Sequence, residues 1–318
     1  MTPPGSDHFN GKTFFNPGEP VGHGLLDVLR WKFKNQAMEW PKWVEIAAQP
    51  SPPPPRDDSV IATWVNHSTF LLQIAKLSLL TDPVFSQRVS PVSWVGPKRV
   101  HAPGVAFESL PRIDAVLISH DHYDHCDLPS LRRLAREHRP LFVVPLGYRA
   151  LLAGVGVTRI VELDWWQTHP LAPGVTVTLT PSRHWCRRSP GNRNRRLWGG
   201  FYLQSSWRRV WFLGDTGYDG ALFREIGQRC GPPDLALIPI GAYEPRWFMQ
   251  AAHMNPAEAV KTHLDCGALQ SVAMHWGTFQ LTDEAREAPP QALAQALTAA
   301  GLPAEKFRVL APGGSLCV

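Results

Sequence analysis

The densest group of metal-ligating side chains in this sequence is LISHDHYDHCD, residues 117–127, which holds three histidines and three aspartates. It overlaps the end of Ile113–Ser119, a short and mostly apolar stretch with the length and β-branched content of a buried strand. Charged and imidazole groups at such a strand end are costly to desolvate unless something pairs with them. A divalent metal ion can pair with several of them at once. The pattern His-x-His-x-Asp-His therefore favours a metal site over a polar loop with one hydrogen-bonded histidine.

Three further segments place a histidine or an aspartate at the end of an apolar run. His184 follows the expected strand 175–182, Asp215 follows the run VWFL between glycines, and His275 ends the stretch SVAMH. A single histidine at a strand end is more often a hydrogen-bonded part of the core than a ligand. Four strand ends with His, Asp or both are much harder to explain by chance, and one loop cannot supply two metal sites. We therefore expect the four segments to converge on one centre.

The order of these residues resembles the ligand set of the metallo-β-lactamase fold, which is shared by dinuclear metal hydrolases. In chain order the matching residues are His120, His122, Asp124, His125, His184, Asp215 and His275. Longer segments resemble, within that fold, the family of N-acyl-phosphatidylethanolamine-hydrolysing phospholipases D. These segments are WVNHSTFLL, LTDPVFSQRVSPVSWVGPKR, AVLISHDHYDHCD, VELDWWQ, HWCRR, FLGDTGY, AHMNPAEAV and HWGTF. The resemblance extends from Asn16 to Phe279.

The resemblance implies an α/β protein with a four-layered αβ/βα sandwich and two zinc ions where the strand ends of its two sheets meet. It assigns the first zinc ion to His120, His122 and His184. It assigns the second to Asp124, His125 and His275, with Asp215 as the bridge between the two ions. Neutral imidazoles and carboxylates are ligands that suit zinc, while iron or manganese at one position stays open.

The remaining acidic residues of the histidine motif, Asp121 and Asp127, lie outside the family ligand set. We expect them to accept hydrogen bonds from the remote N–H groups of metal-binding imidazoles, or simply to be solvated. Cys126 is another potential ligand in this segment, but the resemblance does not support a thiolate ligand there.

Three residues are candidates for contact with the substrate. The resemblance places Tyr123, inside the histidine motif, and His253, just before an expected helix, against the substrate. A buried, hydrogen-bonded phenol is an equal alternative for Tyr123, whereas a helix N-terminus beside His253 favours phosphate. Arg187 is a candidate for binding an anionic head group, with a solvated basic loop as the alternative. Catalysis is assigned to Asp124, Asp215 and His253.

The implied activity is that of a zinc-dependent phosphodiesterase of the phospholipase D type. Such an enzyme hydrolyses N-acyl-phosphatidylethanolamine or a related glycerophosphodiester to N-acylethanolamine and phosphatidic acid, through a metal-bridging hydroxide that attacks phosphorus. One alternative is hydrolysis of another ester, lactone, β-lactam or phosphodiester, RNA included, at the same centre. Another is a scaffold that binds lipid without catalysis, against which the intact ligand set argues. The expected partner is thus a phospholipid or glycerophosphodiester and not nucleic acid.

Hydrophobic periodicity predicts the elements that position these residues. Helices are expected at 128–138, 219–229, 256–266 and 289–300, and Pro256 after Asn255 is typical of a first helical turn behind its cap. Strands are expected at 59–65, 69–74, 76–85, 113–119, 140–146, 159–164, 175–182, 200–206, 208–215, 234–241 and 270–276. Strand pairs followed by strand–helix alternation predict sheets covered by helices.

Residues 1–58 are expected to form an N-terminal arm, and residues 59–318 the catalytic domain. The arm is loop-rich, with a helical candidate at Leu25–Trp40 and a proline-rich connector at Gln49–Asp58. Its apolar residues lie among Lys and Arg, which suits a lipid interface, with packing onto the core as the equal alternative. They are Leu25, Leu26, Leu29, Trp31, Phe33, Trp40 and Trp43.

Composition excludes some classes of protein. With 318 residues, 44% of them hydrophobic and 19% charged, the chain is typical of a globular protein of one or two domains. A formal charge of +5 suits an anionic substrate but falls short of a nucleic-acid-binding signature. Five scattered cysteines predict reduced thiols. The sequence shows neither a secretory signal pattern nor an apolar run of ~20 residues, so we expect a cytoplasmic protein. Peripheral contact with the membrane is one further option, and a homodimer is another.

Overall fold

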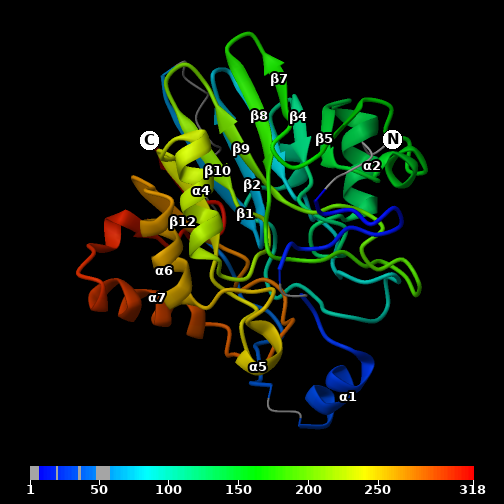
Figure 1. Ribbon diagram of the computed structural model, residues 1–318, viewed down its shortest axis with the longest axis vertical. Helices are drawn as coiled ribbons and strands as arrows, with labels where there is room; N and C mark the ends of the chain where they lie inside the picture. Colours follow the sequence, from blue (N-terminus) through cyan, green and yellow to red (C-terminus); the bar gives the residue numbers. More distant parts are fainter. Residues whose placement is uncertain (1–6, 19–20, 35–36, 48–57) are drawn as a thin grey trace.

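The central strands of the protein bury both faces, and this requires cover on two sides. Phe70, Leu72 and Ile74 belong to one hydrophobic core, whereas Leu71 between them belongs to another. Side chains alternate between the faces of a strand, so each of these faces must meet a separate layer. The computed structural model describes residues 7–18, 21–34, 37–47 and 58–318, and in this part of the chain the layers are two sheets and the helices outside them (Figure 1).

Within the described ranges, each of the two sheets has seven strands. The first sheet runs β14 (Ser315–Cys317), β1 (Val60–Asn66), β2 (Thr69–Ile74), β3 (Leu77–Thr81), β4 (Ala115–Leu117), β5 (Leu141–Pro145) and β6 (Ile160–Leu163). The second runs β13 (Phe307–Arg308), β12 (Gln270–Met274), β11 (Leu235–Pro239), β10 (Arg209–Phe212), β9 (Gly200–Gln204), β8 (Val175–Thr180) and β7 (Thr168–Ala172). Strands β3 to β6 are parallel, as are β10 to β13. Parallel strands end at one edge of their sheet, which brings the loops that follow them together.

Helices cover the outer faces of both sheets, with α2 beside the first sheet and α4, α6 and α7 beside the second (Figure 1). The helices are α1 (Leu25–Lys34), α2 (Leu128–Glu137), α3 (Arg149–Ala153), α4 (Gly220–Cys230), α5 (Arg246–Met249), α6 (Pro256–Asp265) and α7 (Ala288–Ala299), with 3₁₀ turns at Phe107–Ser109 and Ala304–Lys306. Leu131 and Leu134 of α2 share a core with Val116 and Phe142 of the first sheet. This arrangement confirms the predicted four-layered αβ/βα sandwich.

The predicted helices of the catalytic region correspond to α2, α4, α6 and α7 to within one residue at each end. Asn255 caps α6 in a capping box with Glu258, and Pro256 occupies the first turn, as predicted. The sequence does not predict β7, β13 or β14. The segment THPLA of β7 contains a proline and lies at a sheet edge, and β13 and β14 are only two and three residues long. Such short edge strands are too brief to show a periodicity.

The first described residues of the arm are fastened to the body of the molecule. The imidazole of His8 stacks on Trp165 with a centroid distance of 4.2 Å, and its Nε2 lies 2.7 Å from a carboxylate oxygen of Asp164. Phe14 is buried in the main core. Asn16 donates a hydrogen bond of 2.8 Å to the carbonyl oxygen of His184. The arm thus contributes to the core, and its division from the rest of the chain at residue 58 stays a prediction.

The apolar residues around α1 differ in their exposure, and contact of the exposed ones with lipid stays a prediction. α1 ends at Lys34, six residues before the predicted end at Trp40. Trp31 and Trp40 face the body and donate their indole N–H groups to the carboxylate of Asp283 and the carbonyl of Glu284. Leu26 and Phe33 are 80% and 86% exposed. Residues 49–57 of the predicted proline-rich connector lie outside the described residues.

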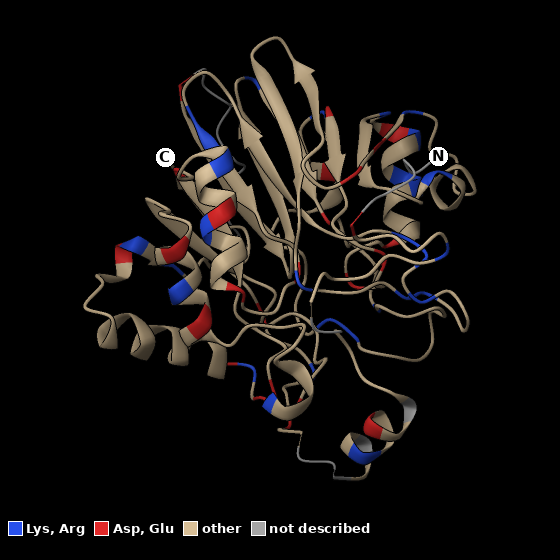
Figure 2. Ribbon diagram, in the orientation of Figure 1, with Lys and Arg blue, Asp and Glu red and all other residues tan. Residues whose placement is uncertain are grey.

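The five cysteines, all within the described ranges, are free thiols. Arg224, Glu225 and Arg229 place both signs of charge along α4, which covers the second sheet (Figure 2). Among the residues that the structure describes, no helix combines the length and the apolar character needed to cross a membrane.

The contact between His8 and Asp164 predicts a pH-dependent attachment of the arm. Burial lowers the pKa of His8, but hydrogen bonds to Asp164 and Asp7 outweigh it, so the pKa is raised above its usual value. A histidine with a raised pKa in the folded state contributes stability that is fully present below about pH 6.5 and lost as the pH rises through the folded-state pKa. The difference in unfolding free energy between the wild type and His8→Gln should therefore be larger at about pH 6 than at about pH 9. Urea unfolding at both pH values measures it, with His169→Gln on the edge strand β7 as the control; a pH-independent difference would contradict the prediction.

Candidate metal centre

The predicted ligand segments all begin where a strand ends, at the same edge of the sandwich. The histidine motif follows β4, His184 follows β8, Asp215 follows β10, and His275 directly follows β12. β8 and β10 are each antiparallel to β9 and so run in the same direction, and β10 is parallel to β12 through β11. The topology therefore brings His184, Asp215 and His275 to one edge of the second sheet, and Asp215 lies within 4.0 Å of imidazole nitrogens of the motif after β4.

Three histidines form the first group. The Nε2 atom of His120 lies 2.9 Å from Nδ1 of His122, and the Nε2 atom of His184 lies 3.3 Å from the same Nδ1. Nitrogen ligands at about 2.0–2.1 Å from a tetrahedral ion lie about 3.3–3.4 Å apart. The three nitrogens are thus spaced as the ligands of one ion, and each comes from a buried or half-buried side chain.

A carboxylate and two histidines form the second group. The Oδ2 atom of Asp124 lies 3.4 Å from Nε2 of His125 and 3.5 Å from Nε2 of His275. These separations again match the ligands of one ion. The two groups share no residue, so each is suited to a separate ion.

Asp215 lies between the two groups. Its Oδ2 atom is 3.0 Å from Nε2 of His275 and 3.3 Å from Nε2 of His125 in the second group. The same oxygen is 4.0 Å from Nε2 of His120 and 3.9 Å from Nε2 of His184 in the first group. One carboxylate oxygen that faces imidazole nitrogens on both sides is in the position of a bridging ligand.

Several polar atoms at this centre lack the hydrogen-bond partners that buried groups normally have. The Nε2 atoms of His125 and His275 and the Oδ1 atom of Asp215 are buried without a hydrogen-bond partner among the described residues. Buried polar atoms are rarely left unpaired, because desolvation without a partner is costly. Cations coordinated by these nitrogens and oxygens would remove that cost. The buried His/Asp groups therefore fit a dinuclear metal centre, and the imidazole and carboxylate donors suit zinc among other metals.

Burial and neighbouring charges set the protonation of the centre. Burial lowers the pKa of His120 and His184 well below its usual value, so both imidazoles are in the neutral form that binds metal. Burial also lowers the pKa of His275, but Asp215 and Asp124 outweigh it and raise that pKa to about 9. The first group is therefore ready to receive an ion, whereas an ion in the second would replace a proton.

A carboxylate outside the predicted site orients one of the ligands. Asp82 is fully buried, and its Oδ2 atom accepts a hydrogen bond of 2.7 Å from Nδ1 of His125. Ser119 donates both its backbone N–H and its hydroxyl to the same carboxylate. His184 is oriented in a similar way, because its Nδ1 lies 3.1 Å from the carbonyl oxygen of Ala252. The signal for Asp82 was present in the segment LTDPVF, since it directly follows the last residue of β3.

The prediction for the two other aspartates of the motif was wrong. The carboxylate of Asp121 is buried against Arg196 at 2.7 Å. The carboxylate of Asp127 accepts hydrogen bonds from Ser86 and Ser130. Both carboxylates are thus neither solvated nor bonded to the imidazoles of the predicted ligands, because each is bonded to partners of its own.

A further histidine, His67, lies beside the second group, although it is not one of the predicted ligands. Its Nε2 atom lies 3.1 Å from Oδ2 of Asp124, and it lies in the turn between β1 and β2. It clusters with Asp124, His125 and His275. Its segment WVNHSTFLL was among those that resembled the family, and this was the only signal the sequence offered.

Of the predicted substrate-binding residues, His253 lies closest to the metal groups. Its Nδ1 atom is 3.8 Å from Oδ2 of Asp215 and has no hydrogen-bond partner among the described residues. Arg246 donates to the carbonyl oxygen of His253 and pairs with Glu258 through two bonds of 2.8 and 3.0 Å. The loop that carries His253 is therefore fixed to the first turn of α6.

The other candidates beside the motif have different roles. The hydroxyl of Tyr123 donates a hydrogen bond of 2.7 Å to the carbonyl oxygen of Arg188, which supports the alternative of a hydrogen-bonded phenol. Arg187 is exposed, and it is Arg188 that contacts the motif, through the carbonyls of Asp121 and Cys126. Burial raises the pKa of the Cys126 thiol to about 12, and no metal-binding group among the described residues includes it.

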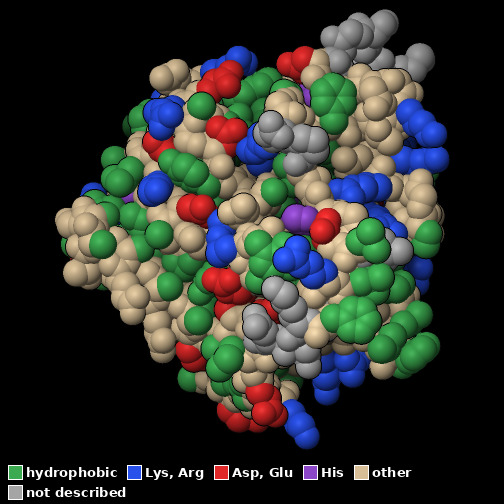
Figure 3. Space-filling model, turned by 60° about the horizontal axis from the view of Figure 1, so that its bottom comes forward, with side chains coloured by type: hydrophobic (Ala, Val, Ile, Leu, Met, Phe, Trp, Pro, Cys, Tyr) green, Lys and Arg blue, Asp and Glu red, His purple; other side chains and the backbone are tan. Residues whose placement is uncertain are grey.

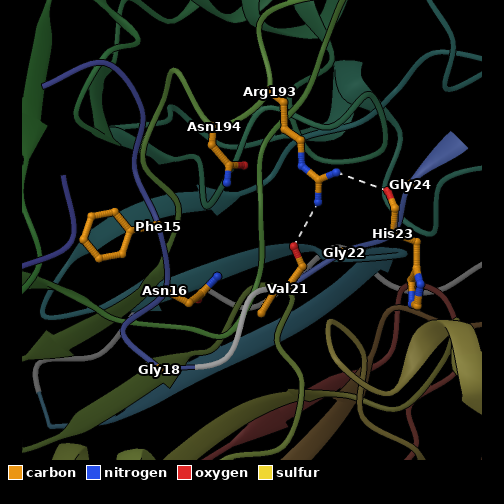
Figure 4. A pocket seen from close by; sticks show the side chains of 9 residues that line it. All are labelled: Phe15, Asn16, Gly18, Val21, Gly22, His23, Gly24, Arg193 and Asn194. Atoms are coloured by element: carbon orange, nitrogen blue, oxygen red, sulfur yellow. Dashed lines mark hydrogen bonds between the residues drawn. The ribbon is translucent and has the colours of Figure 1, made fainter. Parts of the chain in front are cut away.

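Two cavities of about 500 Å³ border the loops of the centre. One is lined by Tyr123, Arg188 and residues 86–88 and 90–93. The other lies between Phe15, Asn16, Gly18 and Val21–Gly24 of the arm and Arg193, which donates to the carbonyls of Val21 and His23 (Figure 4). The guanidinium of Arg193 lies 4.8 Å from the ring of Trp185, the residue after His184. The arm is thus clamped to the loop that carries a predicted ligand.

Comparisons with known proteins agree with this geometry. The family model described as the Beta-lactamase superfamily domain matches residues 78–276. The sequence is 35% identical over 293 residues to N-acyl-phosphatidylethanolamine-hydrolyzing phospholipase D 1 of Caenorhabditis elegans, covering 86% of this chain and 82% of that protein. It is 36% identical over 230 residues to the mitochondrial N-acyl-phosphatidylethanolamine-hydrolyzing phospholipase D of Saccharomyces cerevisiae, covering 71% of this chain and 49% of that protein, about half its length.

The fold is similar to that of Igni18, a metallo hydrolase of Ignicoccus hospitalis. The TM-score is 0.61 at 23% sequence identity, and the match covers 82% of this chain and 98% of Igni18. Together with the relatives in sequence, this likeness confirms the predicted resemblance.

The two groups of ligands predict two metal ions per chain. Elemental analysis of protein purified without chelator should find close to that ratio, and Asp215→Asn should lower both metal content and activity most, because a neutral amide is a poor bridge for two cations. Asp234→Asn is a matched control. Asp234 directly precedes β11, away from the centre, and its carboxylate accepts a hydrogen bond from the backbone N–H of Arg209. Metal-free protein whose activity is insensitive to chelator would contradict the prediction.

Proposed function

Because this chain belongs to the metallo-β-lactamase superfamily of metal-dependent hydrolases, we propose that it hydrolyses phosphodiesters with two zinc ions. The observation that carries the proposal is the position of Asp215, whose Oδ2 atom lies within 4.0 Å of imidazole nitrogens from both groups. His120, His122 and His184 would hold the first ion, and Asp124, His125 and His275 the second.

The residues around the ions have distinct roles in this proposal. Two zinc ions at this centre would lower the pKa of a bound water and neutralise charge on the phosphate oxygens. Asp124 and Asp215 would supply negative charge to bind the ions. His253 faces the same space with an unpartnered Nδ1, and Arg246 holds its backbone. The imidazole of His253 is therefore placed to hydrogen-bond a phosphate oxygen of the substrate.

The substrate that we propose is N-acyl-phosphatidylethanolamine or a related glycerophosphodiester. The support is the similarity to the worm and yeast proteins, both named as phospholipases D that hydrolyse this lipid. The products would be N-acylethanolamine and phosphatidic acid. Arg187 is exposed beside the loop of His184 and is available to an anionic head group. Tyr123 lines the cavity beside the motif with its ring, since its hydroxyl is bonded to Arg188.

The bond that is broken can be identified by isotope labelling. Attack of water on phosphorus leaves solvent oxygen on the phosphate product, whereas attack on a carbonyl carbon leaves it on a carboxylate. Hydrolysis of N-acyl-phosphatidylethanolamine in oxygen-18 water should therefore label phosphatidic acid, as mass spectrometry of the products would show. Label in a released fatty acid would reject the phospholipase D activity and indicate an acyl hydrolase at the same centre.

The same assay tests His253. His253→Ala should lower diester hydrolysis at least tenfold, in the range usual for loss of one positioned acid–base or hydrogen-bonding group, while both metal ions stay bound. His169→Ala, at the edge strand β7, serves as the control and should match the wild type. Loss of metal from His253→Ala would instead make His253 part of the metal centre.

We also propose that α1 contacts the lipid surface from which the substrate is taken. Leu26, Leu29 and Phe33 are exposed and recur at positions i, i+3 and i+7 on one side of the helix. Trp94, in the loop before Arg99, is 77% exposed. Figure 3 views the end of the molecule that carries α1 and shows hydrophobic side chains there beside Lys and Arg. Apolar side chains with basic neighbours suit the surface of an anionic bilayer.

This contact predicts a difference between two kinds of substrate. The double variant Leu26→Ser/Phe33→Ser should lower the rate on phospholipid vesicles several-fold and leave the rate on a soluble short-chain diester unchanged. Leu264→Ser/Leu269→Ser is a matched control, because these leucines are 54% and 56% exposed on another part of the surface. Equal rates for the wild type and the α1 variant on vesicles would contradict the proposal. Point substitutions are preferable to removal of residues 1–48, which would also delete Phe14 from the core.

A further inference from the structure

The backbone of His67 has an unusual conformation. The residue is 1% exposed and has a φ of 44°, in the left-handed region that residues other than glycine seldom adopt. Its N–H donates to Oγ1 of Thr278 at 2.9 Å, and its carbonyl oxygen accepts from the indole of Trp64 at 2.9 Å and from the N–H of His275 at 3.0 Å. Such conformations persist where surroundings enforce them, and they cluster at functional sites.

His275, which is bonded to that carbonyl oxygen, also has a left-handed backbone, with a φ of 61°. The two imidazole rings lie 4.1 Å apart between centroids. The Nε2 atoms of His67 and His275 are 3.1 and 3.5 Å from the same atom, Oδ2 of Asp124. Two uncommon backbone conformations, joined by a hydrogen bond, thus bring two imidazoles to one carboxylate oxygen.

The surroundings of the His67 ring determine which nitrogen carries the proton. Nδ1 is buried and has no hydrogen-bond partner among the described residues, whereas Nε2 faces the carboxylate of Asp124. A proton on Nδ1 would leave a buried donor unpaired and turn the Nε2 lone pair toward a negative oxygen. A proton on Nε2 makes a charge-assisted hydrogen bond instead. The Nε2–H tautomer is therefore the favoured form.

We infer that His67 is a positioning residue for the second metal ion. Its Nε2–H holds the carboxylate of Asp124, and its carbonyl oxygen holds the backbone of His275. One residue thereby fixes two of the three ligands assigned to that ion, one through its side chain and one through its main chain. The inference rests on the proposed two-metal function. The competing role is that of a fourth ligand, since the Nε2 atom of His67 also lies within 4.8 Å of the other ligand atoms of its group.

A pair of amide substitutions separates these roles. The side chain of glutamine places an N–H group close to where Nε2 of histidine lies, whereas asparagine is one methylene shorter and tolerates a left-handed backbone. We expect His67→Asn to lower the affinity for the second zinc ion 10- to 100-fold, which is typical for loss of a group that orients a ligand. His67→Gln should bind it within about threefold of the wild type, in keeping with a retained hydrogen bond. The affinity for the first zinc ion should be unchanged in both variants. Chelator competition on the zinc-loaded full-length protein measures both affinities without relying on activity.

Two controls make the outcome decisive. His101→Gln changes another buried histidine, whose Nε2 lies 3.0 Å from the same Thr278 hydroxyl, and it should leave both affinities unchanged if general damage to the core is not the cause. The visible absorption of the cobalt-loaded protein should be the same for His67→Gln and the wild type, whereas loss of an imidazole ligand would change it in both variants. Wild-type affinity in His67→Asn, or equal losses with altered spectra in both variants, would overturn the inference. A wild-type protein that binds fewer than two ions would reject the proposed function and, with it, this role of His67.

Discussion

The structure depends on a small volume in which carboxylates and imidazoles are buried against one another at the edge of two sheets. Asp215 is 3% exposed, and its Oδ2 atom faces four imidazoles from three loops. Burial of so many titratable groups is costly unless cations balance them. The parallel topology, the buried Asp82 and the left-handed turns at His67 and His275 all hold these groups at separations that fit a dinuclear metal centre.

The loops of the centre are supported from outside by segments distant in sequence. Asn16 of the arm bonds to the carbonyl of His184, and Arg193 in the loop after His184 bonds back to the arm. Arg246 fixes the loop of His253 to α6. Because a displacement of a ligand by a fraction of an ångström weakens metal binding and catalysis, these contacts give the arm a role in holding the loops of the predicted ligands.

Much of the chemistry could be predicted from the sequence. The seven predicted ligands lie after apolar runs that are long enough to be recognised as strands, so the type and the place of each residue were both visible. The same is true of the cap of α6, because Asn255 and Pro256 act through local backbone geometry. Residues whose partners are remote were harder to judge: Asp121 and Asp127 lie in the same motif as the ligands, but their partners, Arg196 and Ser86, are not neighbours in sequence.

The sequence by itself determined the types and spacing of the predicted ligands and the position of most helices, because these follow from motifs and local periodicity. The sandwich of two sheets was predicted from the family resemblance of those motifs, since periodicity alone indicated only an α/β protein. Only the tertiary structure decided which polar groups face the centre. It selected Asp82 and His67 over Asp121 and Asp127 and joined the hydroxyl of Tyr123 to Arg188. It also bonded the half-buried Trp31 and Trp40 to Asp283 and Glu284 and left Leu26 and Phe33 exposed. Hydrogen bonds and burial depend on the relative placement of segments far apart in the chain, and no local pattern encodes that placement.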